Sequence, residues 1–288
     1  MGSEMCIRDR DKILKFLAGR AITGIEVVNN DEYLRTVKLQ NAEGQQFCGW
    51  VRVGHRPAEN TLSVTVSESL LPVLPEVLAR IKNLFDLYCE PKAVYETLQV
   101  MNTLQPGLCV LGTRLPGCFN VFEMSVRAVL GQQITVKAAS TLAARLVAAY
   151  GTQVQTGIEG LTHSFPAPAA ILALGENISE HLGKLGIISA RANTIYQLAR
   201  VLADEKNDFG FWGNPEEEMQ KLQSIRGIGS WTAQYIAMRA MGWPDAFLPT
   251  DAGIKKALPD HTPKELQALS EAWRPWRSYA TVNLWNTL

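Results

Sequence analysis

Between residues 22 and 67 the hydrophobic and polar positions alternate over four short runs, with turn-forming residues between them. The runs begin at Ile22, Tyr33, Phe47 and Leu62. Alternation with a period of two is typical of strands that bury one face, and short connections make neighbouring strands antiparallel. Helical periodicity precedes the runs at 11–20 and follows them at 75–87. We therefore predict a small α+β domain over residues 1–90.

From residue 91 onward the apolar positions recur every three or four residues, which is the period of an α-helix. Glycine-containing turns separate several of these segments, and no run is a convincing strand. The predicted helices are 122–130, 136–150, 167–174, 188–203, 215–224, 231–241, 253–258 and 264–273. Residues 204–214 resemble a loop that connects helices. The pattern predicts a multi-helix body.

Composition narrows the classes of protein to consider. The formal net charge is zero, but two mildly basic regions, 91–200 and 221–288, lie on either side of an acidic stretch at 201–220. This distribution fits a protein that contacts a few phosphates of a nucleic acid. No window is apolar enough for a membrane span. The odd number of scattered cysteines argues against zinc or iron–sulfur clusters and indicates a cytoplasmic protein.

The first ten residues match no periodic pattern and lack the apolar region of a signal peptide. We interpret residues 1–10 as a remnant of cloning or of a gene boundary.

The segment Arg226-Gly-Ile-Gly-Ser230 separates two predicted helices and is a candidate phosphate site. Glycines at 227 and 229 allow a tight bend that exposes main-chain N–H groups, and the helix that begins near Ser230 adds the positive end of its dipole. The alternative is that the two glycines only connect packed helices. Because an amphipathic helix precedes the turn and Thr232 opens the second helix, the order favours a helix–hairpin–helix element that binds a phosphate of the DNA backbone.

Asp251 lies beyond the second of these helices and has two interpretations. A Thr-Asp pair before a helical segment is typical of an N-cap. The same carboxylate could act in catalysis, because N–H donors at a helix start favour negative charge, and negative charge suits a transition state that develops positive charge.

Aromatic residues crowd the last fifth of the chain, where Trp231 and Tyr235 stand one helical turn apart. Most of these rings are expected in the core. Some could line a pocket that stacks on an electron-poor base, since aromatic faces attract positive charge.

Several sequence blocks, in order, resemble the bacterial DNA-3-methyladenine glycosylase II family of the helix–hairpin–helix DNA glycosylase superfamily. The resemblance runs from about Lys12 to Leu288. The blocks are Phe16-Leu-Ala-Gly-Arg-Ala, Leu84-Phe-Asp-Leu, Leu115-Pro-Gly-Cys, Arg127-Ala-Val-Leu-Gly-Gln, Gly227-Ile-Gly-Ser-Trp-Thr-Ala, Phe247-Leu-Pro-Thr-Asp and Trp273-Arg-Pro-Trp-Arg-Ser-Tyr-Ala. The family implies an α+β fold with an N-terminal antiparallel sheet like that of the TATA-binding protein. Two helical domains follow, 91–120 plus 244–288, and 121–243 with the hairpin, and the active-site cleft lies between them.

The resemblance also implies roles for single residues. It makes Asp251 the catalytic aspartate, and it places four aromatic side chains in the base pocket: Trp231, Tyr235, Phe16 and Trp285. DNA would be held by Gly227, Ile228, Gly229, Ser230 and Thr232. Gln133 would enter the duplex as a wedge. A monovalent cation, Na⁺ or K⁺, would bind the main-chain carbonyls of Gln223, Ile225 and Ile228.

The chain departs from the family at three positions. Arg226 replaces a usual proline and adds a cation, and Gln133 replaces a leucine wedge. Asn286 replaces an aromatic residue and predicts a base pocket that is more polar or less closed. The closing Asn-Leu-Trp-Asn-Thr-Leu also resembles glycosylase modules fused behind a methyl-transferring repair domain. We therefore leave open that the chain is a piece of such a fusion.

The family implies a monomeric base excision repair enzyme that acts on double-stranded DNA containing alkylated bases, above all 3-methyladenine and related N-alkylpurines. It would flip the base out and hydrolyse the N-glycosidic bond without a cofactor for the chemistry. Trp231 occupies the position of the lysine nucleophile of strand-cutting members, so no lyase activity is expected. The alternative is a non-catalytic DNA-binding module that uses only the hairpin.

Overall fold

The computed structural model describes the chain except residues 1–6, 30, 57, 59–60 and 204–213, and except the side chains of residues 7–10. The predicted N-terminal sheet is confirmed. It is antiparallel with the strand order β1-β2-β3-β4, so each strand pairs with its neighbour in sequence. The strands are β1 (Glu26–Asn29), β2 (Glu32–Gln40), β3 (Gln46–Arg56) and β4 (Thr61–Val66).

Two helices pack on this sheet, α1 (Ile7–Ala18) and α2 (Leu74–Leu84), the second preceded by the 3-10 segment η2 (Glu68–Val73). Their apolar faces join the inward side chains of the central strands in one buried cluster. The cluster includes Ile13, Leu17, Val77, Ile81, Val37 and Val51. The helical periodicity predicted at both ends of the sheet is confirmed. The helix α1 also includes residues 7–10, which the sequence pattern assigned to no element.

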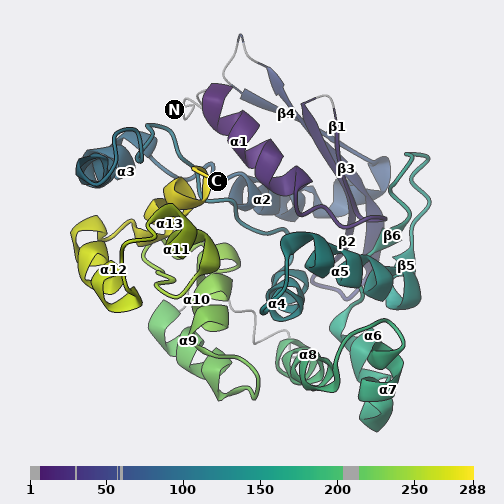
Figure 1. The fold of residues 1–288 in the computed structure, drawn as a ribbon. Helices are drawn as coiled ribbons and strands as arrows, with labels where there is room; N and C mark the ends of the chain where they lie inside the picture. The colour runs from purple at the N-terminus through teal and green to yellow at the C-terminus, as the bar shows by residue number, and fades with distance from the viewer. Residues whose placement is uncertain (1–6, 30, 57, 59–60, 204–213) are drawn as a thin grey trace.

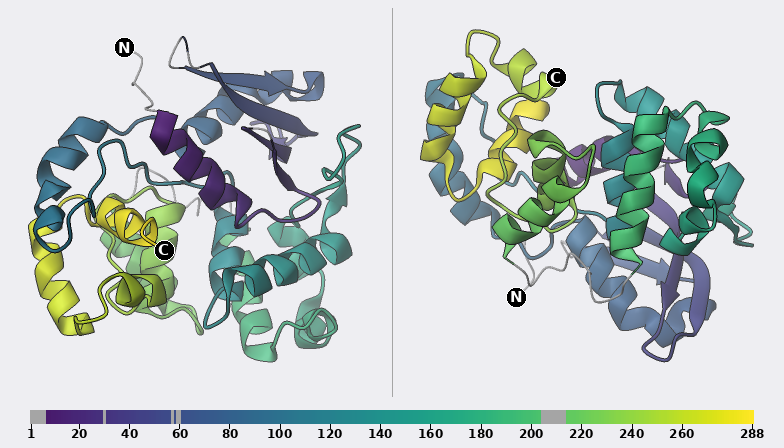
Figure 2. Two further views of the ribbon diagram at one scale, coloured as in Figure 1. Left: turned by 45° about the horizontal axis from the view of Figure 1, so that its top comes forward. Right: turned by 90° about the horizontal axis from the view of Figure 1, so that it is seen from below.

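The rest of the chain is mainly helical, as expected, and Figure 2 shows the helices grouped in two bodies beside the sheet. One body contains α4 (Val121–Leu130), α5 (Val136–Tyr150), α6 (Pro168–Leu172), η4 (Gly175–Asn177), α7 (Ile178–Gly183), α8 (Ser189–Leu202), α9 (Pro215–Ser224) and α10 (Ser230–Arg239). The other contains α3 (Pro91–Leu98), η3 (Gln99–Thr103), α11 (Ala252–Ala257), α12 (Pro263–Ser270), η6 (Glu271–Trp273) and α13 (Arg277–Trp285).

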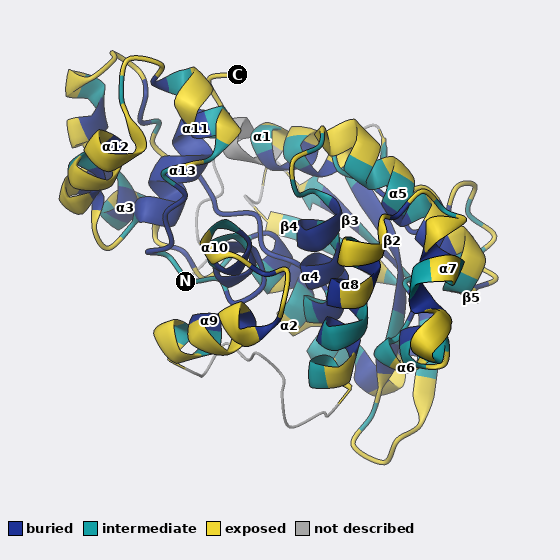
Figure 3. Cartoon of the chain, turned by 60° about the horizontal axis from the view of Figure 1, so that its bottom comes forward, coloured by how far each residue is buried: buried dark blue, intermediate teal, exposed yellow. Residues whose placement is uncertain are grey.

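Each body has its own buried apolar cluster, and Figure 3 shows the buried residues in dark blue. The first cluster also takes in Ile22 and Ile25, which precede β1, so the N-terminal region contributes directly to the neighbouring helical core. The second cluster joins residues from α3 with others from α11 and α13, and it receives Met238 from α10. The helix α10 therefore contributes to both bodies.

Two features differ from the sequence-based expectation. A short ladder, β5 (Thr152–Gln153) with β6 (His163–Ser164), occurs where no strand was expected. Strands of two residues are too short to show alternation. The structure also has three helices that the periodicity did not predict, α3, α7 and α13. Most of the expected connector 204–214 lies outside the described residues. None of the described helices is long and apolar enough to span a membrane.

Candidate active site

A cleft of about 1340 Å³ opens between the two helical bodies, next to the C-terminal end of α1. It brings together side chains that are far apart in the sequence. Of the residues singled out above, its walls contain Phe16, Gln133, Gly227, Gly229, Trp231, Thr232, Tyr235, Asp251 and Trp285. Gln223, Ile225, Ile228 and Ser230 are not among its lining residues. The cleft therefore joins the proposed hairpin, wedge, aromatic rings and carboxylate in one space.

The carboxylate of Asp251 caps α11 and also faces the cleft. Its Oδ1 accepts hydrogen bonds from the main-chain N–H groups of Gly253 at 2.9 Å and Ile254 at 3.1 Å. Two indole N–H groups complete the set. Trp285 Nε1 donates to Oδ1 at 2.8 Å, and Trp231 Nε1 donates to Oδ2 at 3.2 Å. The N-cap prediction is confirmed. All four contacts are with N–H donors, the surroundings that suit a carboxylate oxygen.

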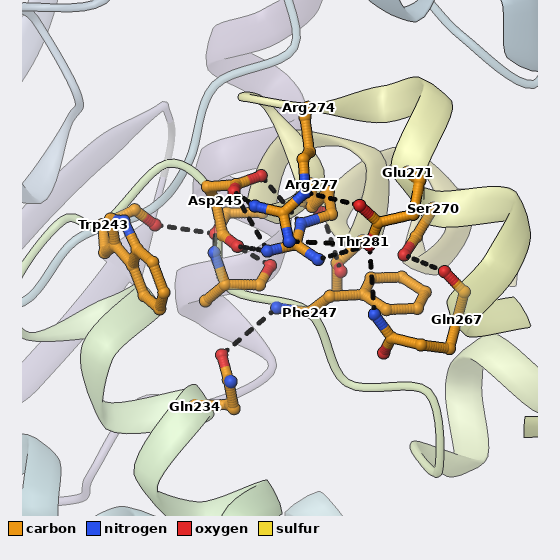
Figure 4. A network of polar contacts seen from close by, with 12 residues as sticks. Gln234, Trp243, Asp245, Phe247, Gln267, Ser270, Glu271, Arg274, Arg277 and Thr281 are labelled. Atoms are coloured by element: carbon orange, nitrogen blue, oxygen red, sulfur yellow. Dashed lines mark hydrogen bonds and ion pairs between the residues drawn. The ribbon is translucent and has the colours of Figure 1, made fainter. Parts of the chain in front are cut away.

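An ion-pair network holds the segment that leads to Asp251 (Figure 4). Arg277, at the start of α13, binds Asp245 with two parallel bonds, Nε to Oδ1 at 2.7 Å and Nη2 to Oδ2 at 2.9 Å. Arg274 adds a bond to Asp245 Oδ2 at 2.5 Å. On the other side, Phe247 N donates to Gln234 of α10 at 3.3 Å. The segment is thus fixed to the helices that carry Trp285 and Trp231.

The four aromatic residues predicted for the base pocket lie in the cleft and contact one another. The rings of Trp231 and Tyr235 stack with centroids 5.1 Å apart and an angle of 8° between their planes. The centroid of the Trp285 ring lies 6.3 Å from that of the Tyr235 ring and 6.3 Å from that of the Phe16 ring. Phe16 comes from α1 and Trp285 from α13, near opposite ends of the chain, which lie side by side in Figure 1. The arrangement forms an apolar wall beside Asp251.

The turn between α9 and α10 has the geometry of a phosphate-binding hairpin. Gly227 has a φ of +96°, and a Cβ there would lie 2.0 Å from Thr194 Oγ1, so only glycine fits. Gly229 is the N-cap of α10, and a Cβ built on it would meet no atom within 4 Å. No side chain of the described chain caps α10. Its first N–H groups therefore face open space, as anion binding requires.

Two residues of the hairpin make hydrogen bonds within the protein. The main-chain N–H of Ile228 donates to Ile225 O at 3.0 Å within the turn. This N–H is therefore engaged within the turn, and the contact of Ile228 with DNA stays a prediction. The hydroxyl of Thr232 accepts a hydrogen bond from Gln132 Nε2 at 2.9 Å, so its side chain contacts the protein. The N–H groups left to bind a phosphate are those of the first turn of α10.

Gln133 lies in the turn between α4 and α5, exposed at the rim of the cleft, with a φ of +56°. This left-handed conformation is unusual for a residue other than glycine. Its neighbour Gln132 holds the turn: Nε2 donates to Gly227 O at 2.9 Å as well as to Thr232, and the Gln132 carbonyl accepts from Arg191 Nη2. The turn that carries the proposed wedge is thus bonded to the hairpin through Gln132. Gln132 and Arg191 were not predicted.

The inner wall of the cleft is charged, which the sequence analysis missed. The buried carboxylates of Glu26 and Glu123 pair with Arg127 at 3.0 Å and 2.9 Å, and Glu123 also pairs with Arg35 at 2.7 Å. Several pairs at this wall are spaced four residues apart in sequence, Glu123 with Arg127 among them. An arginine one helical turn from an acidic or aromatic residue is the signal that could have revealed this wall.

Arg239 and Arg20 complete the wall beside Tyr235. Arg239 Nη1 donates to Tyr235 Oη at 3.0 Å. Burial by itself would raise the pKa of Tyr235, but the positive charges of Arg239 and Arg20 outweigh it and lower that pKa. Burial lowers the pKa of Arg20. An arginine nevertheless stays charged in a protein, so this end of the cleft is positive.

Asn286 does not lie in the cleft. It is exposed and borders a separate small cavity with Lys12 and Arg114. Asn286 shares this small cavity with Phe16 but is not among the residues that line the cleft, so its expected effect on the base pocket stays a prediction.

Comparison with known proteins places the site in a family. The family model described as "AlkA N-terminal domain" matches residues 8–120. A second family model, described as "HhH-GPD superfamily base excision DNA repair protein", matches residues 126–275. DNA-3-methyladenine glycosylase 2 of Escherichia coli is 36% identical over 275 residues, which are 96% of this chain and 92% of that protein.

Two further relatives support the comparison. A probable bifunctional transcriptional activator/DNA repair enzyme AlkA of Mycobacterium tuberculosis is 36% identical over 94% of this chain, but the match spans only 53% of that longer protein. The solved 3-methyladenine DNA-glycosylase from Archaeoglobus fulgidus has the same fold, with a TM-score of 0.80, 20% identity, and coverage of 99% of this chain and 97% of that one. The chain therefore belongs to the HhH-GPD superfamily of base excision DNA repair proteins.

Proposed function

We propose that this protein removes alkylated bases, above all N-alkylpurines such as 3-methyladenine, by hydrolysis of the N-glycosidic bond. The observation that carries the proposal is the position of Asp251, whose carboxylate faces the cleft next to three aromatic rings and across from the hairpin. The names of the relatives from Escherichia coli and Archaeoglobus fulgidus support the same class of substrate.

The parts of the cleft divide the work. N–H groups at the start of α10 bind one phosphate of the damaged strand, and Gln133 fills the space that the flipped nucleotide leaves. The base then stacks against the aromatic wall. Unstacking it costs a few kcal/mol, and less for a damaged pair.

Asp251 acts on the sugar. An alkylated purine leaves readily because its ring already carries positive charge. The developing oxocarbenium ion lies near the fixed carboxylate, which stabilises it electrostatically and orients water at C1′. The hydrogen bonds from Trp285, Trp231 and the start of α11 keep the carboxylate in place. No reorganisation is then needed during the reaction.

The decisive experiment compares release of free base from a methylated duplex by the protein and by Asp251→Asn. The amide oxygen can still accept the three bonds at Oδ1, so the α11 cap is retained. We expect release to fall by about 100-fold or more, as for loss of a preorganised electrostatic group. Equal release by both proteins would remove Asp251 from the mechanism. Release by neither would favour the non-catalytic DNA-binding module.

We further propose that the enzyme leaves the DNA strand intact. Strand cleavage by the lysine route needs an amine that forms a Schiff base, and the position for that amine holds Trp231, whose indole N–H donates to Asp251. Borohydride reduction during the reaction should trap no covalent protein–DNA adduct, and a trapped adduct would contradict the proposal.

We propose that a monovalent cation binds three main-chain carbonyl oxygens at the hairpin, those of Gln223, Ile225 and Ile228. Main-chain oxygens suit a hard cation, and the Ile225 carbonyl retains a lone pair after accepting from Ile228. Such an ion would add positive charge beside the phosphate. Replacing K⁺ or Na⁺ by tetramethylammonium at constant ionic strength should weaken DNA binding.

We propose that the enzyme acts on duplex DNA as a monomer, because one chain supplies every wall of the cleft. Sedimentation of the complex with a short duplex tests this. The match spans only 53% of the longer mycobacterial relative, whose name describes a bifunctional protein, and this supports the possibility of a fusion with a methyl-transferring domain. Sequencing the region that flanks the gene would test that expectation.

A further inference from the structure

Phe16, one of the aromatic rings of the cleft, is covered by the protein's own cations. The Arg20 guanidinium carbon lies 3.7 Å from the centroid of the Phe16 ring, and that of Arg239 lies 4.6 Å from it. Both arginines line the cleft. A ring face occupied by a guanidinium attracts a second cation less strongly. At this wall the pocket does not favour a positively charged base.

The two arginines differ in their hydrogen bonds. Arg239 is buried, and Nε, Nη1 and Nη2 donate to Pro116 O, Tyr235 Oη and Gly117 O. Arg20 is only half-buried. Its Nη1 makes one long bond, 3.4 Å, to Phe16 O, and its guanidinium also interacts with the Tyr235 hydroxyl. A guanidinium has five N–H donors, so Arg20 has donors left for a ligand in the cleft.

The position of Arg20 is fixed through its main chain. Its carbonyl accepts a hydrogen bond from Arg127 Nη2, and Arg127 is held in turn by Glu26 and Glu123. Those two carboxylates are balanced by Arg127 and Arg35. Within the described residues, no carboxylate forms an ion pair with Arg20 or Arg239. The wall therefore carries excess positive charge at a fixed place.

We propose that Arg20 contributes to specificity by donating hydrogen bonds to an oxygen or nitrogen acceptor on the flipped base. This contact speeds the release of neutral bases more than the release of cationic ones, whose own positive charge already makes them good leaving groups. The proposal rests on the base-excision function proposed above. A neutral oxopurine, such as the deaminated base hypoxanthine, offers a carbonyl oxygen and ring nitrogens as acceptors. A cationic N-alkylpurine meets like charge at the same wall.

The chemistry explains why the effect appears in the rate. When the bond from C1′ to the base breaks, its electron pair goes to the base. A neutral base leaves as an anion, which Arg20 stabilises until the anion takes up a proton from solvent. Water adds to C1′ and loses a proton, so one water is consumed. A cationic base leaves neutral and gains nothing from the guanidinium.

The test uses two duplexes that differ only at one nucleotide, deoxyinosine in one and 7-methyldeoxyguanosine in the other. Single-turnover release of each base is measured, and the ratio of the two rates is compared between the wild type and Arg20→Gln. We expect the hypoxanthine to 7-methylguanine ratio to fall about 10- to 100-fold, the factor for loss of a charged hydrogen bond in a desolvated site. Arg20→Lys, which keeps the charge, should give an intermediate ratio.

The matched control is Arg226→Gln, the same substitution at the exposed turn of the hairpin. It should slow both lesions equally and leave the ratio unchanged. Because each ratio comes from one preparation, partial misfolding of a variant cancels. An unchanged ratio in Arg20→Gln would overturn the role of Arg20 alone. If the wild type released neither base, the proposed function itself would fail.

Discussion

At the scale of single residues, Asp251 shows how one side chain can serve the fold and the chemistry together. One oxygen, Oδ1, caps α11 and accepts the bond from Trp285, while Oδ2 has Trp231 as its one hydrogen-bond donor among the described residues and lies toward the cleft. The cap and the catalytic role are therefore not alternatives. The same N–H groups that stabilise the helix start hold the carboxylate where positive charge is proposed to develop.

The two glycines of the hairpin allow a prediction that separates stability from DNA binding. Gly229→Ala places a methyl group in open space in front of the α10 amides, so it should leave the melting temperature almost unchanged and weaken duplex binding several-fold. Fluorescence anisotropy with a labelled duplex measures the binding.

Gly227→Ala is the comparison for that experiment. Its φ of +96° and the clash with Thr194 should cost about 1–3 kcal/mol of unfolding free energy. If Gly229→Ala lowered the free energy of unfolding as much as Gly227→Ala, the space in front of Gly229 would not be open and could not hold a phosphate.

At the scale of elements, the α4–α5 turn and the α9–α10 hairpin are one unit, although 95 residues separate Gln132 from Gly227 along the chain. The Gln132 side chain bonds two hairpin residues, and Arg191 of α8 bonds its carbonyl. The proposed wedge residue Gln133 is therefore held in place relative to the proposed phosphate site.

We predict that Gln132→Ala uncouples these two elements. Duplex affinity should fall modestly. Extrusion of the target nucleotide, followed by the fluorescence of a neighbouring 2-aminopurine, should fall by about 30-fold for two lost hydrogen bonds of about 1 kcal/mol each. Gln220→Ala, exposed on α9, is the control and should match the wild type. Equal losses of affinity and extrusion would argue against a coupling role.

The ion pair at the start of α13 leads to a second prediction at this scale. Asp245 and Arg277 form a buried bidentate pair, so Arg277→Met leaves Asp245 poorly paired and should cost about 3–5 kcal/mol of unfolding free energy. Arg274 binds the same carboxylate but is 49% exposed. Arg274→Gln should therefore cost no more than about 1 kcal/mol. Urea unfolding of both variants measures these two losses. Similar losses would contradict the larger role of the buried Arg277 in pairing with Asp245.

At the scale of the whole molecule, Asp86 joins the N-terminal region to the C-terminal helices. It follows α2, with Oδ2 accepting from Leu115 N at 2.8 Å and Oδ1 accepting from the Tyr279 hydroxyl at 3.1 Å. Burial raises the pKa of Asp86 to about 6, from an ordinary value of 3.8. The Asp86 carboxylate therefore binds a proton more tightly in the folded than in the unfolded protein.

This linkage predicts a pH dependence of stability. Below pH 3.8 Asp86 is neutral in both the folded and the unfolded state, so its ionisation does not lower the free energy of unfolding. Between 3.8 and 6 the unfolded state ionises first, so stability falls as the pH rises, by up to about 3 kcal/mol, and stays constant above 6. In Asp86→Asn this contribution disappears, and asparagine tolerates the φ of +54°. Urea unfolding of both proteins between pH 4 and 7 gives the difference, and parallel curves would contradict the shifted pKa.

Local patterns predicted most elements correctly. The alternation at 33–39 and 47–53 gave strands β2 and β3, and helix periodicity gave α4, α5 and α10. Such patterns report which face of an element is buried, and this depends only on nearby residues. The β5–β6 ladder was missed because its pairing depends on contacts across the chain, including the bridge between Gly24 and Leu161.

The sequence by itself determined the hairpin, the cap at Asp251 and the family. Glycine conformation, capping and motif order are local properties that a short segment carries wherever it folds. Only the tertiary structure decided the surroundings of the site: the two indoles on Asp251, the bond from Gln132 to the hairpin, and the arginine wall beside Phe16. Apart from Arg20 over Phe16, these contacts join residues about 20 to 220 positions apart. Their geometry depends on how α1, α4, α10 and α13 pack around one cleft.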